Sequence, residues 1–143
     1  QKNSIFVVET HLFMNQHLAL VSVVVADYDE AIQFYTQKLH FRLIEDTPLS
    51  ETKRWVVVSP QGSGSSGILL AKAGNSEQMQ YIGNQTGGRV FLFLHTDNFD
   101  RDFKNLQKHK IQIVREPVEE SYGKVAVFAD LYGNLWDLIE PKK

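Results

Sequence analysis

The chain has 143 residues, of which 43% are hydrophobic and 22% are charged, as expected of one folded globular domain. The formal net charge is −2 and no basic run stands out, which argues against nucleic acid and membrane surfaces as partners. The absence of cysteine excludes disulfides, thiolate metal sites and a cysteine nucleophile, and it fits a cytoplasmic location. No apolar run approaches the roughly 18 residues of a membrane span.

The N-terminal stretch QKNSIFVVETHLF lacks an initiator Met, and its apolar segment is too short for a signal peptide. The regular pattern of the chain begins just after Met14. We therefore expect residues 1–13 to be a non-native or disordered extension, and residues 14–143 to form a single domain.

Residues 17–73 predict a first βαβββ module. The stretch 17–26 is rich in β-branched residues and is a strand candidate. Asp27 is a good helix N-cap, and Glu30 three residues later completes a capping-box pattern. Apolar residues at helical spacing then predict an amphipathic helix that ends near Leu39. Three further strands are predicted at 41–46, 54–60 and 67–73; the glycine-rich loop before the last of them lacks the Lys-Ser/Thr of a phosphate-binding loop.

A second module with the same pattern follows at 89–141, after a polar linker at 74–88. A strand is predicted at 89–96, a helix at 97–109, and strands at 111–116, 124–130 and 135–141. Six apolar residues of the first module match apolar residues of the second at a shift of 71 residues. They are Val21, Val23, Tyr28, Ile32, Tyr35 and Leu43, which fall on Leu92, Leu94, Phe99, Phe103, Leu106 and Val114. The sequence thus predicts a duplicated unit of the α+β class.

Two such modules form a cupped mixed sheet with the helices on its outer face, because each helix covers only one sheet face. The two remaining faces must be buried as well, and together they predict a cup for a small ligand.

Three fragments, VVVADYDEAIQFYTQKLHF, VFLFLHTDNFDRDFKNL and VFADLYGNLWDLIEP, occur in this order at the duplication spacing. In this the chain resembles the vicinal oxygen chelate superfamily over residues 17–141. That superfamily includes glyoxalase I, extradiol dioxygenases and bleomycin-resistance proteins. The ending resembles the family's DPDG turn followed by a strand, with Leu131 and Tyr132 in place of the usual Pro and Asp. The resemblance also implies a homodimer.

Metal-dependent members of that superfamily place ligands at four equivalent points. Carried over to this chain, these points are Leu20, Leu70 (or Leu69, if the register slips by one), Phe91 and Asp137. Three hydrocarbon side chains and one carboxylate do not supply the N, S or O ligands that divalent ions need. We therefore expect neither a metal nor another cofactor. His40 and His109 close the two predicted helices and are interpreted as solvated helix ends.

Strand alternation predicts which side chains face the cup. If Leu20 and Phe91 point into it, so do Ser22, Phe93 and His95. The loop expected at 115–124 could place Tyr122 over the cup as a lid, although a solvated charged hairpin is the preferred interpretation. The candidate ligand-binding residues are His95, Asp137, Ser22, Phe91, Phe93, Leu20, Trp55 and Tyr122, and no catalytic residue is assigned.

Three of these candidates have a second interpretation. His95 stands at a strand end and is either a rim residue or a pocket donor or base. Asp137 must find a donor, reach water or stay protonated, so it bonds either backbone N–H groups, a nearby arginine or a ligand. Trp55 either packs in the core or stacks on a flat ligand.

The resulting functional hypothesis is a metal-independent protein that binds an apolar or aromatic small molecule in the cup and sequesters a drug or metabolite. One alternative is a glyoxalase-like lyase or isomerase, or a dioxygenase, whose metal is held by unexpected ligands. Another is a metal-independent enzyme in which His95 and Asp137 act as acid and base.

Overall fold

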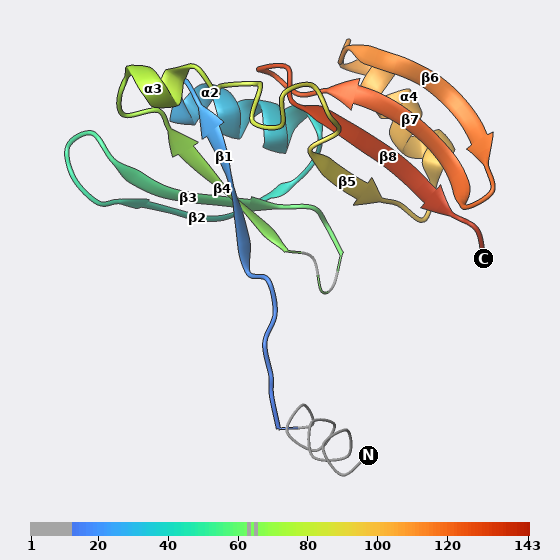
Figure 1. Cartoon of the computed structure of the whole chain (residues 1–143), viewed down its shortest axis with the longest axis horizontal. Coiled ribbons are helices and arrows are strands. Elements are labelled where there is room, and N and C mark those ends of the chain that lie inside the picture. Colours follow the sequence, from blue (N-terminus) through green and yellow to red (C-terminus); the bar gives the residue numbers. More distant parts are fainter. Residues whose placement is uncertain (1–12, 63, 65) are drawn as a thin grey trace.

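The structure is a computed structural model that describes residues 13–62, 64 and 66–143 (Figure 1). The extension expected at 1–13 therefore lies outside the described residues except for Phe13. Two four-stranded sheets lie side by side, each with a helix against one face (Figure 1). In the described part of the chain, no helix is long and apolar enough to cross a membrane.

The first module forms one of these sheets, which we call sheet A. Its strands are β1 (Leu20–Val25), β2 (Arg42–Pro48), β3 (Arg54–Ser59) and β4 (Gly67–Lys72). They are ordered β1-β4-β3-β2, with β1 parallel to β4 and the other pairs antiparallel. The predicted helix forms as α2 (Tyr28–Gln33) and continues as the π-helical turn η1 (Phe34–Lys38). Strand β1 starts three residues later than the predicted strand.

The second module forms sheet B from β5 (Leu92–His95), β6 (Ile113–Glu120), β7 (Gly123–Ala129) and β8 (Leu135–Pro141). Their order, β5-β8-β7-β6 with β5 parallel to β8, repeats that of sheet A strand for strand. Helix α4 (Phe99–Lys108) packs against this sheet and lies behind it in Figure 1. The repeated order confirms the α+β class and the two tandem βαβββ modules.

The sheet faces that carry the helices share one core across both modules. Buried residues of β1, β3, β4, β7 and β8 belong to a single hydrophobic cluster with residues of α2, η1 and α4. Trp136 of β8 joins the modules, because its ring lies 6.1 Å from Tyr35 of η1 and 5.9 Å from Phe41, measured between ring centroids. Aromatic pairs at such distances contribute about 0.5–1.5 kcal/mol each beyond their buried area.

The turn DLYGN at 130–134 carries a second connection between the modules. The buried Asp130 accepts hydrogen bonds through Oδ1 from the backbone N–H groups of Tyr132, Gly133 and Asn134. Its Oδ2 accepts a 2.5 Å bond from the hydroxyl of Tyr35 in the first module. Burial, and next the charge of Asp130, raise the pKa of Tyr35 well above its usual value. This acid is thus fully used by the fold.

Tyr132 of the same turn binds the start of α2. Its hydroxyl donates to the Glu30 carboxylate at 2.8 Å, and burial followed by this contact raises the pKa of Tyr132 to about 12. Asp27 caps the helix as predicted, accepting from the Glu30 N–H at 2.8 Å. The Glu30 carboxylate binds Tyr132, so the second half of the predicted capping box is replaced by a contact between modules.

The linker at 74–88 is more ordered than its polar composition suggests. It contains a short helix, α3 (Ser76–Met79), that the sequence pattern does not predict, with Asn75 as its N-cap. Further along, the Gln85 side chain accepts from the Val24 N–H at 2.7 Å and donates to the Ser22 carbonyl at 3.1 Å. The Gln85 amide therefore pairs with β1 much as a neighbouring strand would.

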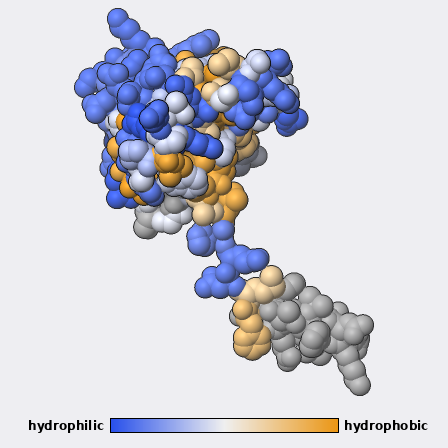
Figure 2. All heavy atoms as spheres, turned by 90° about the vertical axis from the view of Figure 1, so that its left-hand side faces the viewer, coloured by the Kyte–Doolittle hydropathy of each residue, from blue (hydrophilic) through white to orange (hydrophobic). Residues whose placement is uncertain are grey.

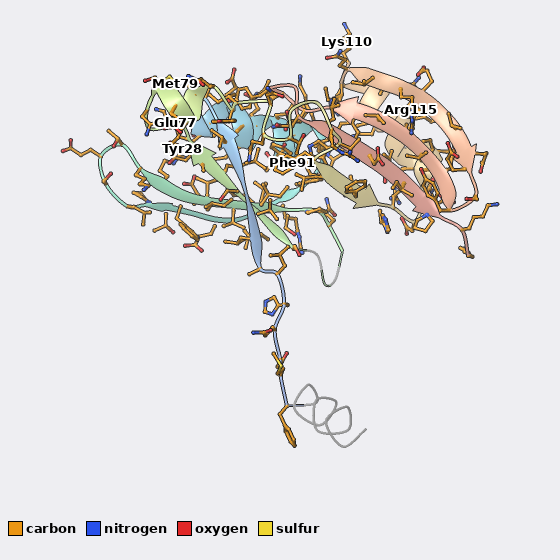
Figure 3. All side chains as sticks on the ribbon, in the orientation of Figure 1. Tyr28, Glu77, Met79, Phe91, Lys110 and Arg115 are labelled. Carbon is orange, nitrogen blue, oxygen red and sulfur yellow. The ribbon has the colours of Figure 1, made fainter. Side chains whose placement is uncertain are left out.

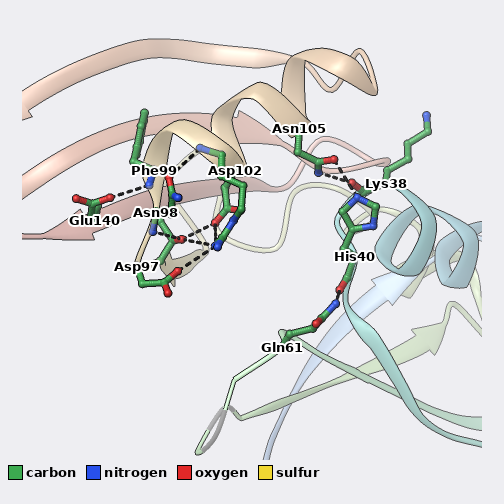
Figure 4. Close-up of polar contacts among 11 residues, drawn as sticks. Lys38, His40, Gln61, Asp97, Asn98, Phe99, Asp102, Asn105 and Glu140 are labelled. Atoms are coloured by element: carbon green, nitrogen blue, oxygen red, sulfur yellow. Dashed lines mark hydrogen bonds and ion pairs between the residues drawn. The ribbon is translucent and has the colours of Figure 1, made fainter.

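The ends of the two helices meet instead of lying free in solvent (Figure 4). His40 Nε2 is 3.0 Å from Asn105 Oδ1 of α4, and Asn105 Nδ2 donates to the Lys38 carbonyl at 2.7 Å. The rings of His40 and His109 lie edge to face with their centroids 5.6 Å apart. Both histidines stand at helix ends as interpreted, and His40 is exposed. The sequence did not predict that they also contact residues more than 60 positions away.

Strand β6 corrects the loop that the sequence predicts at 115–124. The strand continues through Pro117 to Glu120, so that only Ser121 and Tyr122 turn between β6 and β7. Two register shifts, on either side of Arg115, interrupt its pairing with β7. Such bulges let an edge strand accommodate a proline, which cannot donate to the ladder.

Candidate ligand-binding site

Each sheet has a second face that points away from its helix. On sheet B the strand register aligns Phe93 of β5, Asp137 of β8, Val127 of β7 and Arg115 of β6 directly across the sheet. We call these four residues the sheet B row. They share the face opposite the core, because alternate side chains of a strand point to opposite faces and the intervening Trp136 and Leu138 belong to the core.

Asp137 stands near the middle of this row and is largely buried, with 8% of its surface exposed. Its Oδ1 atom is inaccessible and has no hydrogen-bond partner in the described structure. Burial raises the pKa of the Asp137 carboxyl above its usual value, and the positive charge of Arg115 offsets part of the rise. Neither backbone N–H groups nor an arginine in direct contact satisfies this oxygen among the described residues.

Arg115 is the nearest positive charge that influences this carboxyl. It is exposed, and no ion pair within the described residues involves its guanidinium. At the other end of the row the side chain of Phe93 is 61% exposed. Val127, which lies between Asp137 and Arg115 in the row, is buried. The sheet B row therefore presents an apolar floor, a carboxylate without a donor and a free cation (Figure 3 labels Arg115).

The other predicted residues of sheet B lie farther from Asp137. His95 follows Phe93 on β5, opposite Ile139, and is exposed on the same face. Phe91 precedes β5 and is half-buried against the core cluster near the junction of the sheets (Figure 3). Tyr122 lies in the β6–β7 turn, five residues along from Val127, which corresponds to about 16 Å of strand.

Three predicted residues lie on the corresponding face of sheet A. Leu20 and Ser22 of β1 and Trp55 of β3 point away from the core, and Trp55 is 37% exposed. A shallow hollow of about 360 Å³ on this face is lined by Leu20, Ile44, Val57 and Ser59, among others. The structure thus divides the predicted residues into two groups, one on each sheet. Except for Phe91, which packs against the core cluster, they lie on surfaces that the helices do not cover.

The four positions implied for metal ligands can now be tested by their chemistry. Leu69 faces the open side of sheet A, since it pairs with Ser22, whereas Leu70 is fully buried in the core. The one-residue slip of register is therefore the correct assignment. Leu20, Leu69 and Phe91 offer no donor atom, and Asp137 offers one carboxylate. The described residues also contain no group of three or more His, Asp or Glu side chains placed to hold an ion. The donor set does not fit a divalent metal.

A larger cleft of about 1270 Å³ lies between the modules and shares Phe93 with the sheet B row. It is bounded by the end of η1, the loop before β4, strand β5 and helix α4. His95 lies on its border, whereas Asp137 and Arg115 do not line it. Its polar residues are largely engaged with one another, as in the contacts of Arg101 with Asp97 and Asp102 drawn in Figure 4.

Arg115 is the residue of this face that sequence reasoning missed. It falls within the strand predicted at 111–116 and at the start of the loop expected at 115–124, but it was not among the candidate ligand-binding residues. The register shift between Ile113 and Arg115 places Arg115 opposite Val127, and such a relation between strands is not encoded in a single stretch of sequence.

Known proteins resemble the chain over nearly all of its length. An uncharacterized protein of Shewanella frigidimarina (strain NCIMB 400) is 59% identical over 128 residues, which cover 89% of this chain and 95% of that protein. Among solved structures, UcmS2 superposes with a TM-score of 0.77 at 29% identity, covering 89% of this chain and 99% of UcmS2. TnmS3, an antibiotic binding protein from Streptomyces sp. CB03234, has a TM-score of 0.71 at 28% identity, covering 91% of this chain and 99% of TnmS3.

The family model of the Glyoxalase/Bleomycin resistance protein/Dioxygenase superfamily matches residues 16–138. That range contains the first module, all but the last three residues of the second, and all eight predicted ligand-binding residues. The strand order supports the same family assignment, since both sheets repeat one βαβββ unit. The chain therefore belongs to the glyoxalase/bleomycin resistance protein/dioxygenase superfamily.

Proposed function

We propose that this protein binds an apolar or aromatic small molecule over the open sheet faces, without a metal, and so sequesters a drug or metabolite. The observation that carries the proposal is Asp137, a buried carboxylate without a hydrogen-bond donor on an otherwise apolar face. A group of this kind costs stability unless a partner supplies the missing donor. The similarity to TnmS3, an antibiotic binding protein, supports a binding role.

The proposal includes a second copy of the chain that closes the ligand site. Large apolar side chains remain exposed on the sheets, among them Ile44 (54%) and Phe93 (61%). Figure 2 shows apolar side chains gathered on the lower side of the molecule, next to the extended segment that leads to residue 13. Exposed apolar surface of this kind marks interaction sites, and a paired sheet from a second copy would complete a cup.

A binding screen by thermal unfolding against aromatic metabolites and antibiotics tests the proposal. A ligand that binds only the folded chain raises the unfolding temperature by mass action. We expect Phe93→Ala to weaken the binding of any hit at least about tenfold, because the ring is lost from the ligand face. Tyr81→Ala is the matched control, since Tyr81 is 50% exposed on the linker, and it should bind as the wild type does.

Elemental analysis of protein purified without chelators decides between this proposal and the metal-dependent alternative. We expect less than stoichiometric Ni, Zn, Fe and Mn. One equivalent of any of these metals, together with turnover of a substrate, would instead identify a lyase, isomerase or dioxygenase whose metal is held by other ligands.

A further inference from the structure

We infer that the ligand of the sheet B row is a flat aromatic molecule with a hydrogen-bond donor at one end and an acceptor at the other. The Asp137 carboxylate would accept a hydrogen bond from the donor of the ligand, and the Arg115 guanidinium would donate one to its acceptor. This inference rests on the proposed function, and it adds both the chemical class of the ligand and a binding residue, Arg115, that the family position of Asp137 does not provide.

The first argument is the state of the two charged groups. Oδ1 of Asp137 has no donor, and no ion pair within the described residues involves Arg115. The two groups influence each other electrostatically, yet they form no ion pair within 4.0 Å, the limit for such contacts. Arg115 is exposed and can meet a ligand group directly, whereas Asp137 keeps only 8% of its surface exposed. A donor that reaches the buried Oδ1 atom of Asp137 breaks no hydrogen bond already made there.

The second argument is their spacing. Asp137 pairs with Val127, and Val127 pairs with Arg115, so two strand intervals separate the charged residues. Neighbouring strands lie about 4.8 Å apart, which puts the two backbones about 10 Å from each other. The side chains of Asp137 and Arg115 extend over the sheet face and shorten this separation. The distance left between the carboxylate and the guanidinium suits one aromatic ring with a substituent at each end. Val127 supplies the apolar floor beneath that ring, and Phe93 an aromatic wall beside Asp137.

The third argument is charge selection. A ligand that is only a cation would gain from Asp137 but meet the positive charge of Arg115. A ligand that is only an anion would gain from Arg115 but meet the carboxylate of Asp137. A molecule that carries both groups in the right order satisfies both residues. A ligand that lacks one of the groups covers Asp137 or Arg115 without pairing it, and this lowers its affinity.

Three probes of nearly equal size test this inference: 4-(aminomethyl)benzoate, 4-methylbenzoate and 4-methylbenzylamine. The first carries both groups, and each of the others replaces one charged group by a methyl or hydrogen. Binding is measured by titration in ¹H–¹⁵N NMR spectra, which detect dissociation constants in the millimolar range. We expect wild-type protein to bind 4-(aminomethyl)benzoate at least about tenfold more tightly than either of the other two.

Two variants assign the selectivity to its residues. Asp137→Asn should bind 4-(aminomethyl)benzoate and 4-methylbenzoate alike, whereas Arg115→Gln should bind 4-(aminomethyl)benzoate and 4-methylbenzylamine alike. Arg89→Gln, an exposed arginine ahead of β5, is the control and should keep the wild-type order. Arg115 is exposed, so its variant tests the inference even if Asp137→Asn were to fold poorly.

The outcomes separate this inference from the proposed function. Equal binding of all three probes by wild-type protein would overturn the inference and leave a purely apolar site, consistent with the proposed function. Selectivity that persists in both variants would assign it to other residues and also overturn the inference. No binding of any probe at millimolar concentration, together with an empty thermal screen, would overturn both.

Discussion

Two buried aspartates near the end of the chain have opposite roles. Asp130 accepts bonds from three backbone N–H groups and from the hydroxyl of Tyr35, so its burial is compensated within the fold. Asp137, seven residues later, is buried to a similar extent and has an oxygen with no partner. Residues that lower the stability of the fold, and that no contact within the fold compensates, are characteristic of functional sites.

Replacing Asp137 should show this cost directly. At neutral pH we expect Asp137→Asn to be more stable than wild type by roughly 1 kcal/mol, because the unpaired buried charge is removed. The pKa of Asp137 is raised above 3.8 in the folded state, so the unfolded chain loses its proton first as the pH rises. The contribution of Asp137 to the free energy of unfolding is therefore complete below about pH 3.8, and it is lost as the pH rises through the raised pKa of the folded state.

Urea unfolding of both proteins between pH 7 and pH 3.5 measures the effect. The advantage of the variant should shrink as the pH falls and Asp137 becomes protonated in the wild type. A variant that is less stable than wild type at pH 7 would show that the carboxylate makes a stabilising contact after all.

At the scale of elements, the linker between the modules is a structural part of the fold. Gln85 pairs with the backbone of β1, and Gly83 lies against the turn that carries Tyr132. A Cβ atom on Gly83 would overlap the Tyr132 carbonyl, a backbone group that cannot move aside easily. The linker therefore fixes the turn before β8, and with it the strand that carries Asp137.

Two glycines of the linker make a matched test. Gly83 has a φ of +75° and Gly87 a φ of +65°, so alanine at either position costs about 1–2 kcal/mol of backbone strain. Nothing lies within 4 Å of a Cβ atom at Gly87. We expect Gly83→Ala to lower the free energy of unfolding by at least about 2 kcal/mol more than Gly87→Ala. Equal losses in urea unfolding would show that the linker does not press against this turn.

At the scale of the whole molecule, the helices cover one side of both sheets and leave the other side open. Polar contacts between modules, such as His40 with Asn105, lie on the helix side. On the opposite faces Ile44, Trp55 and Phe93 remain exposed in a single chain. This asymmetry favours a dimer that pairs open faces.

Sedimentation analysis tests the dimer. We expect a particle of twice the 16.4 kDa chain mass, because two copies bury each other's open faces. Ile44→Lys, on the open side of sheet A, should weaken the dimer by at least about tenfold. Met79→Lys on α3 is the control, since Met79 is 58% exposed but lies away from that face (Figure 3). A wild-type monomer at micromolar concentration would contradict the expectation.

Most of the fold could be predicted because its signals are local. The N-cap at Asp27, the β-branched composition of β1 and the helical spacing of Phe99 and Leu106 each need only a short window. Arg115 was not among the candidate ligand-binding residues, because only the pairing of β6 with β7 and of β7 with β8 places it in line with Val127 and Asp137. The contact of His40 with Asn105 was missed because 65 residues separate the two side chains.

The sequence by itself determined the duplicated βαβββ architecture, since hydrophobic periodicity and a shift of 71 residues express it twice. It also determined that hydrocarbon side chains stand at three of the four family metal positions. Only the tertiary structure showed that Leu69, and not Leu70, faces the open side, and that Asp137 lacks a donor while Arg115 stands two strands away. The physical reason is that strand register and hydrogen-bond partners are relations between distant segments, which no single stretch of sequence encodes.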